Sequence, residues 1–164
     1  MRHRRVEPGP RQESVWDYPR PPELKDSDKR IEVVFGEVTL AYTTRAKRVL
    51  EASHPPVYYV PPEHVRTEYL TLAEGTSFCE WKASVHYYDI GVEERKERRA
   101  AWFYPNPVAA YADLKDYVAF YPSLMDPCWV NGEKVRTQED GFYGGWITPD
   151  IMGPFKGGPG TWGW

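Results

Sequence analysis

The segment SFCEWKASVHYYDI, residues 77–90, contains the residues best suited to covalent chemistry. Cys79 precedes Lys82 by three positions, just before an alternating stretch that predicts a β-strand. The thiolate is the nucleophilic form of cysteine, and a nearby ammonium lowers the thiol pKa. Cys79 and Lys82 are therefore the candidate catalytic pair. In the alternative interpretation, Cys79 packs as a small apolar residue and Lys82 pairs with Glu80 or with solvent.

Aromatic and basic side chains indicate a second kind of site, a pocket for a small molecule. The chain contains seven Trp, twelve Tyr and six Phe in 164 residues. Large rings offer apolar area and can stack on cations, and basic side chains suit an anionic group. The candidate walls of the pocket are Tyr59, Trp81, Trp102, Tyr104 and Phe120, and its candidate polar contacts are His54, Arg66 and Lys82.

Other motifs do not reach the spacing that their chemistry requires. The terminal GPFKGGPGTWGW lacks the spacing of a phosphate-binding loop and the helix that must follow one. Asp26 and Asp28 have the spacing of paired metal carboxylates, but they lie in a polar loop among lysines. No zinc-type cysteine pair occurs, and His54, His64 and His86 lack a metal-ligand spacing. We expect no metal and no cofactor, free thiols at both cysteines, and hydrogen-bonded structural roles for the histidines.

The overall charge and hydropathy narrow the class of protein. The net charge is -3 and the pI is about 5.8, whereas a dedicated nucleic-acid binder normally has a basic excess. The basic opening MRHRR has no apolar core of a signal peptide, and no run of 18 apolar residues occurs. We expect a soluble cytoplasmic protein with no nucleic-acid or membrane partner.

The elements that must position these residues are mostly strands. Sixteen Pro and thirteen Gly predict many turns. Strands are predicted within 31–43, with a tight turn at Gly36-Glu37, and within 57–60, 64–72, 83–90, 99–104, 117–121 and 128–135, with a hairpin turn at Asn131-Gly132. Short helices are predicted within 43–52 and 108–117, and a solvated loop at the charged residues 91–99.

The chain divides into three parts. Residues 1–30 are polar and Pro-rich and predict an extended arm, anchored by Trp16 and Tyr18. Residues 31–136 form the domain, and residues 137–164 form an extension, rich in Gly and aromatics, that packs on it. An additional interpretation makes the arm and the extension a contact between copies of the chain in a homo-oligomer.

Four ordered motifs resemble a known family. HPPVYYVPPEHVR, FCEWKASVHYYD, AAWFYPNP and YVAFY occur in the order typical of the bacterial domain of unknown function 427, over roughly residues 30–136. The resemblance implies a mostly-β fold of the β-tent type, with two antiparallel sheets meeting at an angle. The zinc-binding cysteine pairs of many β-tent relatives are missing here. The family motif Cys-x-x-Lys-Gly is matched at Cys79 and Lys82, but Ala83 replaces its glycine.

Three functions remain open at this stage. The first is a small-molecule-binding module with an aromatic cleft, since the aromatic and basic residues come without a complete catalytic set. The second is an enzyme with Cys79 as a reactive thiol, Lys82 as its activator and His54 or His86 as the base. The third is nucleotidyl transfer, a label that this family sometimes carries. β-Tent relatives often bind ligands between their sheets, which favours the binding module by analogy of fold.

Overall fold

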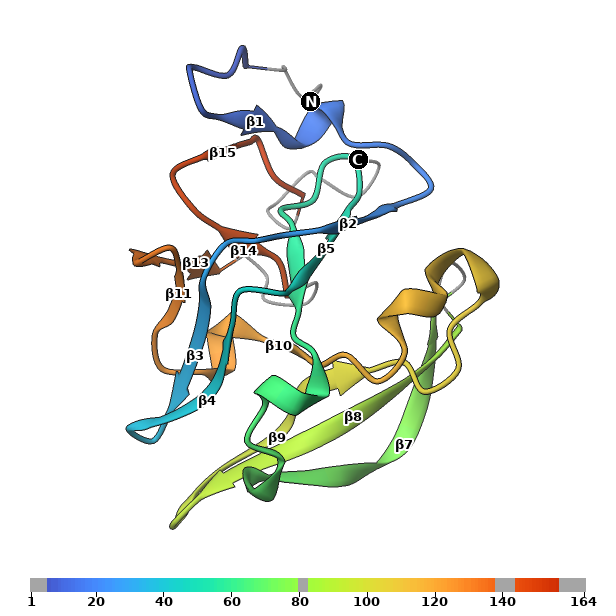
Figure 1. The fold of residues 1–164 in the computed structure, drawn as a ribbon, viewed down its shortest axis with the longest axis vertical. Helices are drawn as coiled ribbons and strands as arrows, with labels where there is room; N and C mark the ends of the chain where they lie inside the picture. Colours follow the sequence, from blue (N-terminus) through green and yellow to red (C-terminus); the bar gives the residue numbers. More distant parts are fainter. Residues whose placement is uncertain (1–5, 80–82, 138–143, 157–164) are drawn as a thin grey trace.

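The computed structural model describes residues 6–79, 83–137 and 144–156, which fold as a mostly-β protein (Figure 1). The mostly-β class is thereby confirmed, whereas the β-tent arrangement stays an implication of the resemblance. In the described residues, two four-stranded sheets and one three-stranded sheet carry most of the strand structure.

The longest strands form a sheet in the order β10-β9-β8-β7 (Figure 1). Its antiparallel strands are β7 Leu70–Cys79, β8 Ala83–Val92, β9 Arg95–Phe103 and β10 Ala119–Phe120. The solvated loop predicted at 91–99 is wrong, because the connection between β8 and β9 shortens to Glu93 and Glu94. Most of the charged run lies in β9, where ladder hydrogen bonds to β8 satisfy the backbone and the charged side chains reach solvent.

A second sheet has the order β12-β11-β3-β4. Its strands are β3 Ile31–Phe35, β4 Val38–Thr43, β11 Cys128–Val130 and β12 Glu133–Lys134. Both predicted tight turns are confirmed, because Gly36 and Glu37 have φ of 56° and 66°, and Asn131 and Gly132 have φ of 49° and 79°. Positive φ at both central residues matches the right-handed twist of the flanking strands.

The third sheet, in the order β2-β5-β6, corrects the predicted helix at 43–52. Its strands are β2 Glu23–Asp26, β5 Lys47–Leu50 and β6 Val57–Tyr59. Good helix formers occupy β5, but pairing with β2 and β6 on both sides outweighs their local preference. The β5 side chains alternate, so that Val49 joins one hydrophobic cluster and Leu50 another.

Helical structure in the described residues is limited to short 3-10 segments. They are η1 Val15–Asp17, η2 Pro62–His64, η3 Thr67–Tyr69, η4 Ala109–Leu114 and η5 Pro122–Leu124. The helix predicted within 108–117 therefore appears as η4, in which Tyr111 departs from helical backbone angles. The extended stretch predicted at 64–72 is interrupted by η3 before β7 begins. No described helix is long and apolar enough to cross a membrane.

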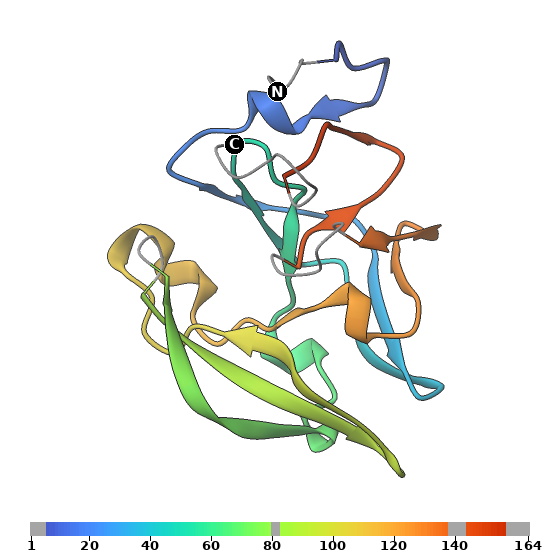
Figure 2. The same cartoon turned by 180° about the vertical axis from the view of Figure 1, so that it is seen from behind.

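The N-terminal arm and the C-terminal extension lie side by side at one end of the molecule (Figures 1 and 2). β1 Glu13–Ser14 pairs in parallel with β15 Ile151–Met152, and β13 Arg136–Thr137 pairs with β14 Trp146–Ile147. Tyr18 is buried, and the indole N–H of Trp16 donates to the carbonyl of Pro154 at 2.8 Å. Both aromatic residues thus hold the arm in place, although the three-part division of the chain stays a prediction.

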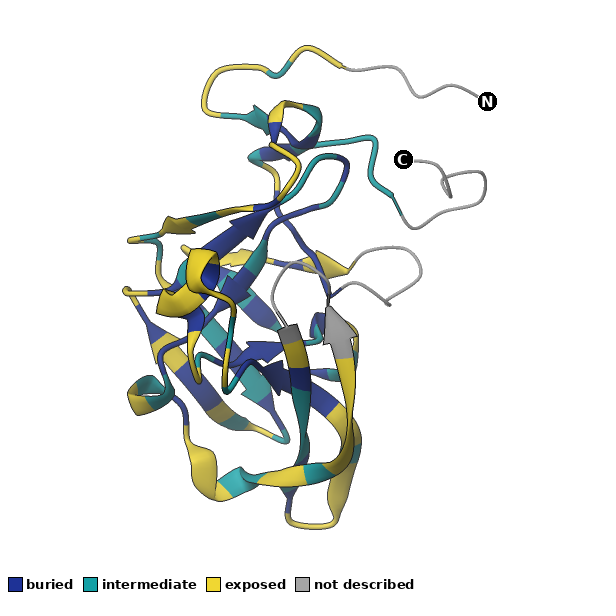
Figure 3. Cartoon of the chain, turned by 90° about the vertical axis from the view of Figure 1, so that its right-hand side faces the viewer, coloured by how far each residue is buried: buried dark blue, intermediate teal, exposed yellow. Residues whose placement is uncertain are grey.

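The main hydrophobic core lies between the two four-stranded sheets (Figure 3). Fully buried residues such as Ile31, Phe35 and Ile90 line it, and each contributes about 1.5–3 kcal/mol through burial. At the tip of the β8-β9 hairpin, both oxygens of Asp126 accept from Arg95, at 2.6 and 2.7 Å. The Arg95 guanidinium also stacks on Phe35 at 4.2 Å, which fixes the first sheet against the β3-β4 turn.

Candidate functional site

The structure gathers aromatic rings from several elements on one side of the β2-β5-β6 sheet. We call this the aromatic cluster and define it by its rings, Tyr59, Tyr87, Trp102, Tyr104, Tyr111, Tyr117 and Tyr121. Strand pairing explains the convergence, because Tyr87 and Trp102 are register partners on β8 and β9, and neighbours across a ladder share a face. Three of the predicted wall residues, Tyr59, Trp102 and Tyr104, belong to the cluster.

The inner rings of the aromatic cluster are buried and hold one another in fixed orientations. Tyr59, Trp102 and Tyr104 are 2%, 6% and 4% exposed. The Trp102 indole N–H donates to the Tyr59 hydroxyl at 3.2 Å, and the two rings meet edge to face with centroids 6.1 Å apart. Such a pair adds about 0.5–1.5 kcal/mol beyond the area it buries. These rings form the buried apolar base of the aromatic cluster.

The outer rings of the aromatic cluster remain partly accessible. Tyr121 packs on Trp102 with centroids 4.5 Å apart, and the guanidinium of Arg99 lies over the Tyr87 ring at 4.4 Å. The Tyr87 hydroxyl donates to the Ser77 hydroxyl at 3.1 Å. Burial raises the pKa of Tyr121 to about 12, with Tyr87 adding to the rise and Arg99 opposing it. The Tyr121 hydroxyl therefore stays protonated at neutral pH and can donate a hydrogen bond.

Arg99 is positioned by an irregularity in the sheet. The β8-β9 register shifts between Tyr88 and Ile90, and Arg99 adopts a left-handed backbone with φ of 49°. Its backbone N–H donates to Asp89 Oδ1 at 2.8 Å, and its guanidinium reaches the carbonyl of Glu74 at 3.4 Å. A non-glycine residue in this region costs about 1–2 kcal/mol, and such strain gathers at functional sites.

Three other predicted contacts lie away from the aromatic cluster. Phe120 follows Ala119 on β10 and faces the opposite way, so it is fully buried in the core between the four-stranded sheets. Arg66 is exposed, stacks on Tyr69 at 5.2 Å and pairs with Glu68 at 3.2 Å. His54 lies on the loop between β5 and β6, with its Nε2 3.9 Å from a carboxylate oxygen of Glu51.

The predicted catalytic pair falls at the edge of the described structure. Trp81 and Lys82 lie outside the described residues, and Cys79 is described only as the backbone end of β7, in register with Ala83. The roles assigned to these residues therefore stay predictions. Cys128 is a free, buried thiol on β11, and burial raises its pKa to about 12. Its side chain points into the hydrophobic core and packs there as a small apolar residue.

His64 and Asp26, two residues of the remaining polar motifs, have structural partners. His64 Nδ1 lies 2.8 Å from the Thr43 hydroxyl, and its Nε2 accepts from Arg45 at 2.9 Å. The Asp26 carboxylate pairs with Lys47 at 2.6 Å. Across the described parts of the chain, no group of three His, Cys, Asp or Glu side chains is arranged to hold a metal ion.

Sequence reasoning missed the accessible part of the site. Tyr87 could have been found, because it follows Val85 by two positions, on the same face of a predicted strand that pairs with the strand carrying Trp102. Arg99 gave no such signal, since its orientation depends on the bulge opposite Asp89. Tyr121 lies just beyond β10, where its packing on Trp102 depends on the path of the loop.

Comparison with known proteins gives one finding and one negative result. A family model described as Domain of unknown function (DUF427), with the short label NTP_transf_9, matches residues 23–131. A search of curated proteins returned no match. The matched range includes Arg99 and all seven rings of the aromatic cluster.

Proposed function

The chain belongs to the family of domain of unknown function 427, whose model matches residues 23–131, and we propose its function from the geometry of the candidate site. The protein is a small-molecule-binding module. Its ligand has a flat apolar part that lies on Tyr87 and Tyr121, and an anionic group that pairs with Arg99. The observation that carries this proposal is the guanidinium of Arg99, which is held over the Tyr87 ring and has no carboxylate partner among the described residues.

Arg99 has the features of a preorganised anion contact. Its guanidinium is placed by the Tyr87 ring and the Glu74 carbonyl, and in the described residues it forms no ion pair with a carboxylate. A planar guanidinium on a ring pays little entropy when it binds a carboxylate or phosphate in a bidentate manner. The exposed side of Arg99 is thus available for an external anion.

The neighbouring rings supply the apolar contact. Tyr121 and Tyr87 are half-buried, and Tyr121 rests on the buried indole of Trp102, which keeps it from collapsing inward. Rigid rings lose little conformational entropy when a ligand stacks on them. The protonated Tyr121 hydroxyl adds a donor near Arg99 for the same anionic group.

A thermal-shift screen tests the proposal. The probes are aromatic carboxylates and nucleoside monophosphates, which combine a flat ring with an anion. We expect some of them to raise the Tm of the native protein. Arg99→Met should weaken binding of those probes by about ten- to a hundredfold, the usual value of a charge-assisted hydrogen bond. Arg98→Met, which removes an equivalent exposed charge one residue earlier on β9, should leave binding unchanged.

Two results would contradict the proposal. The first is the failure of every probe to raise the Tm of the native protein. The second is an equal loss of binding in the Arg98 and Arg99 variants, because general charge attraction would then account for the affinity.

A further inference from the structure

A second polar site lies on the other face of the β2-β5-β6 sheet, away from the aromatic cluster. Arg48 on β5 and Tyr58 on β6 are register partners and share this face. Arg48 is buried although it is charged, with 9% of its side chain exposed. Lys29, which follows β2, pairs with Asp150, and the Asp150 carbonyl accepts from the backbone N–H of Glu13 at 2.8 Å, so the carboxylate partners of Lys29 and Arg48 are neighbours. This face therefore concentrates two cations and a phenol.

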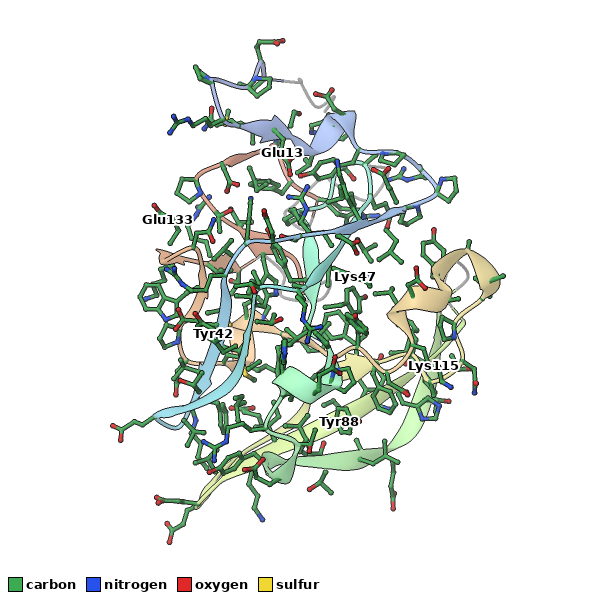
Figure 4. All side chains as sticks on the ribbon, in the orientation of Figure 1. Glu13, Tyr42, Lys47, Tyr88, Lys115 and Glu133 are labelled. Carbon is green, nitrogen blue, oxygen red and sulfur yellow. The ribbon has the colours of Figure 1, made fainter. Side chains whose placement is uncertain are left out.

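Each cation is neutralised by a carboxylate from one end of the chain. Arg48 donates to Glu13 of the arm at 2.8 Å, and Lys29 donates to Asp150 of the C-terminal extension at 2.6 Å. Tyr18 of the arm also donates to Glu13, at 2.6 Å. Glu13 lies on β1, beside β15 (Figure 4). These hydrogen bonds hold the pKa of both Glu13 and Asp150 below its ordinary value, against the effect of burial.

The cations and the carboxylates of these ion pairs come from different parts of the chain. Lys29, Arg48 and Tyr58 lie inside the family region 23–131, whereas Glu13 and Asp150 lie outside it. In these two ion pairs the family region contributes the donors, Arg48 and Lys29, and the segments that flank it contribute the acceptors, Glu13 and Asp150. A buried cation requires a counterion, so the domain without these segments would require an anion from another source.

The Tyr58 hydroxyl strengthens this interpretation. It is buried, and among the described residues no group accepts its O–H, although the Arg48 guanidinium lies near its oxygen. An unsatisfied buried O–H donor is unfavourable. Carboxylates placed by two separate segments thus satisfy the cations and leave this donor unused. A tetrahedral oxyanion has more acceptor positions than a carboxylate, which suits a site with an additional donor.

We infer that Lys29, Arg48 and Tyr58 form an anion-binding site for a phosphate-like group, and that Glu13 and Asp150 occupy it as internal substitutes. An external oxyanion competes with these carboxylates. Because β1 and β15 pair with each other, loss of either carboxylate contact loosens the arm and the extension together.

Titration of full-length protein with inorganic phosphate at constant ionic strength tests the inference. Asp150→Asn removes one internal carboxylate at a half-buried pair, and we expect it to bind phosphate about ten- to a hundredfold more tightly than the native protein. Addition of Lys29→Met should abolish this gain. Asp126→Asn is the matched control, because it removes a carboxylate that pairs with Arg95 at a separate surface, and it should bind as the native protein does.

Several outcomes would overturn the inference. One is a folded Asp150→Asn protein that binds phosphate no more tightly than the native chain, and another is a gain that persists without Lys29. Limited proteolysis of the native protein decides the matter if the variant does not fold. Phosphate should accelerate tryptic cleavage after Arg11 in the arm, relative to chloride of equal ionic strength, and an unchanged rate would refute the competition.

Discussion

Gly144→Ala should destabilise the protein because the backbone of Gly144 lies directly against the aromatic cluster. A Cβ atom at this position would lie 2.5 Å from Cη2 and 3.0 Å from Cζ3 of Trp102, and 3.2 Å from Cδ1 of Tyr121. The same residue has φ of 68°, a conformation that side-chain-bearing residues rarely adopt. The Trp102 ring is buried and hydrogen-bonded to Tyr59, so it cannot move away freely.

The expected magnitude follows from two costs. The left-handed backbone costs about 1–2 kcal/mol once a Cβ is present. Forcing a methyl group into the packed ring costs about 1–3 kcal/mol more. The free energy of unfolding should therefore fall by about 2–5 kcal/mol, and the Tm by about 5–15 °C for a chain of this size.

Chemical and thermal unfolding, followed by circular dichroism, measures this loss, and Gly132→Ala is the control. Gly132 has φ of 79°, but its added Cβ would meet only the end of the flexible Arg30 side chain, at 3.3 Å. The control should therefore incur the backbone cost alone. Equal losses in the two variants would refute the close packing of the C-terminal extension on Trp102.

Three further predictions concern the rest of the molecule. The hydrogen bond from Arg95 lowers the pKa of Asp126, so the native state binds fewer protons than the unfolded chain near pH 4. The free energy of unfolding should therefore fall as the pH drops below about 4. Asp126→Asn should flatten this acid dependence in equilibrium unfolding. Arg95→Met should lower the Tm more than Lys96→Met, because only Arg95 contacts both Asp126 and Phe35; equal effects would contradict the docking of the hairpin tip. The buried Cys128 thiol, with its raised pKa, should resist iodoacetamide at pH 8 in the native protein and react after unfolding, as peptide mass spectrometry can show.

The contrast between β5 and the tight turns shows what could be predicted locally. Asn131-Gly132 and Gly36-Glu37 specified their turns, because positive φ at two successive residues depends on those residues alone. The segment around Lys47–Leu50 was predicted as a helix and is a strand, because its partners β2 and β6 compensate for its helical preference.

The candidate site could likewise be predicted only in part from the sequence. The abundance of aromatic residues, and the predicted strands that carry Tyr59 and Trp102, could be recognised from the sequence, and these residues do lie together. Phe120 was assigned to the same site, but side chains alternate along a strand, and its neighbour Ala119 takes the position facing Trp102.

The sequence by itself determined the mostly-β class, the tight turns and the family, because composition, local backbone preference and ordered motifs are properties of neighbouring residues. Only the tertiary structure decided that Arg99 turns back over Tyr87, and that Arg48 and Lys29 meet carboxylates from opposite ends of the chain. Contacts between distant segments depend on strand register and on a bulge, and a shift of one residue would reverse the face of every side chain involved.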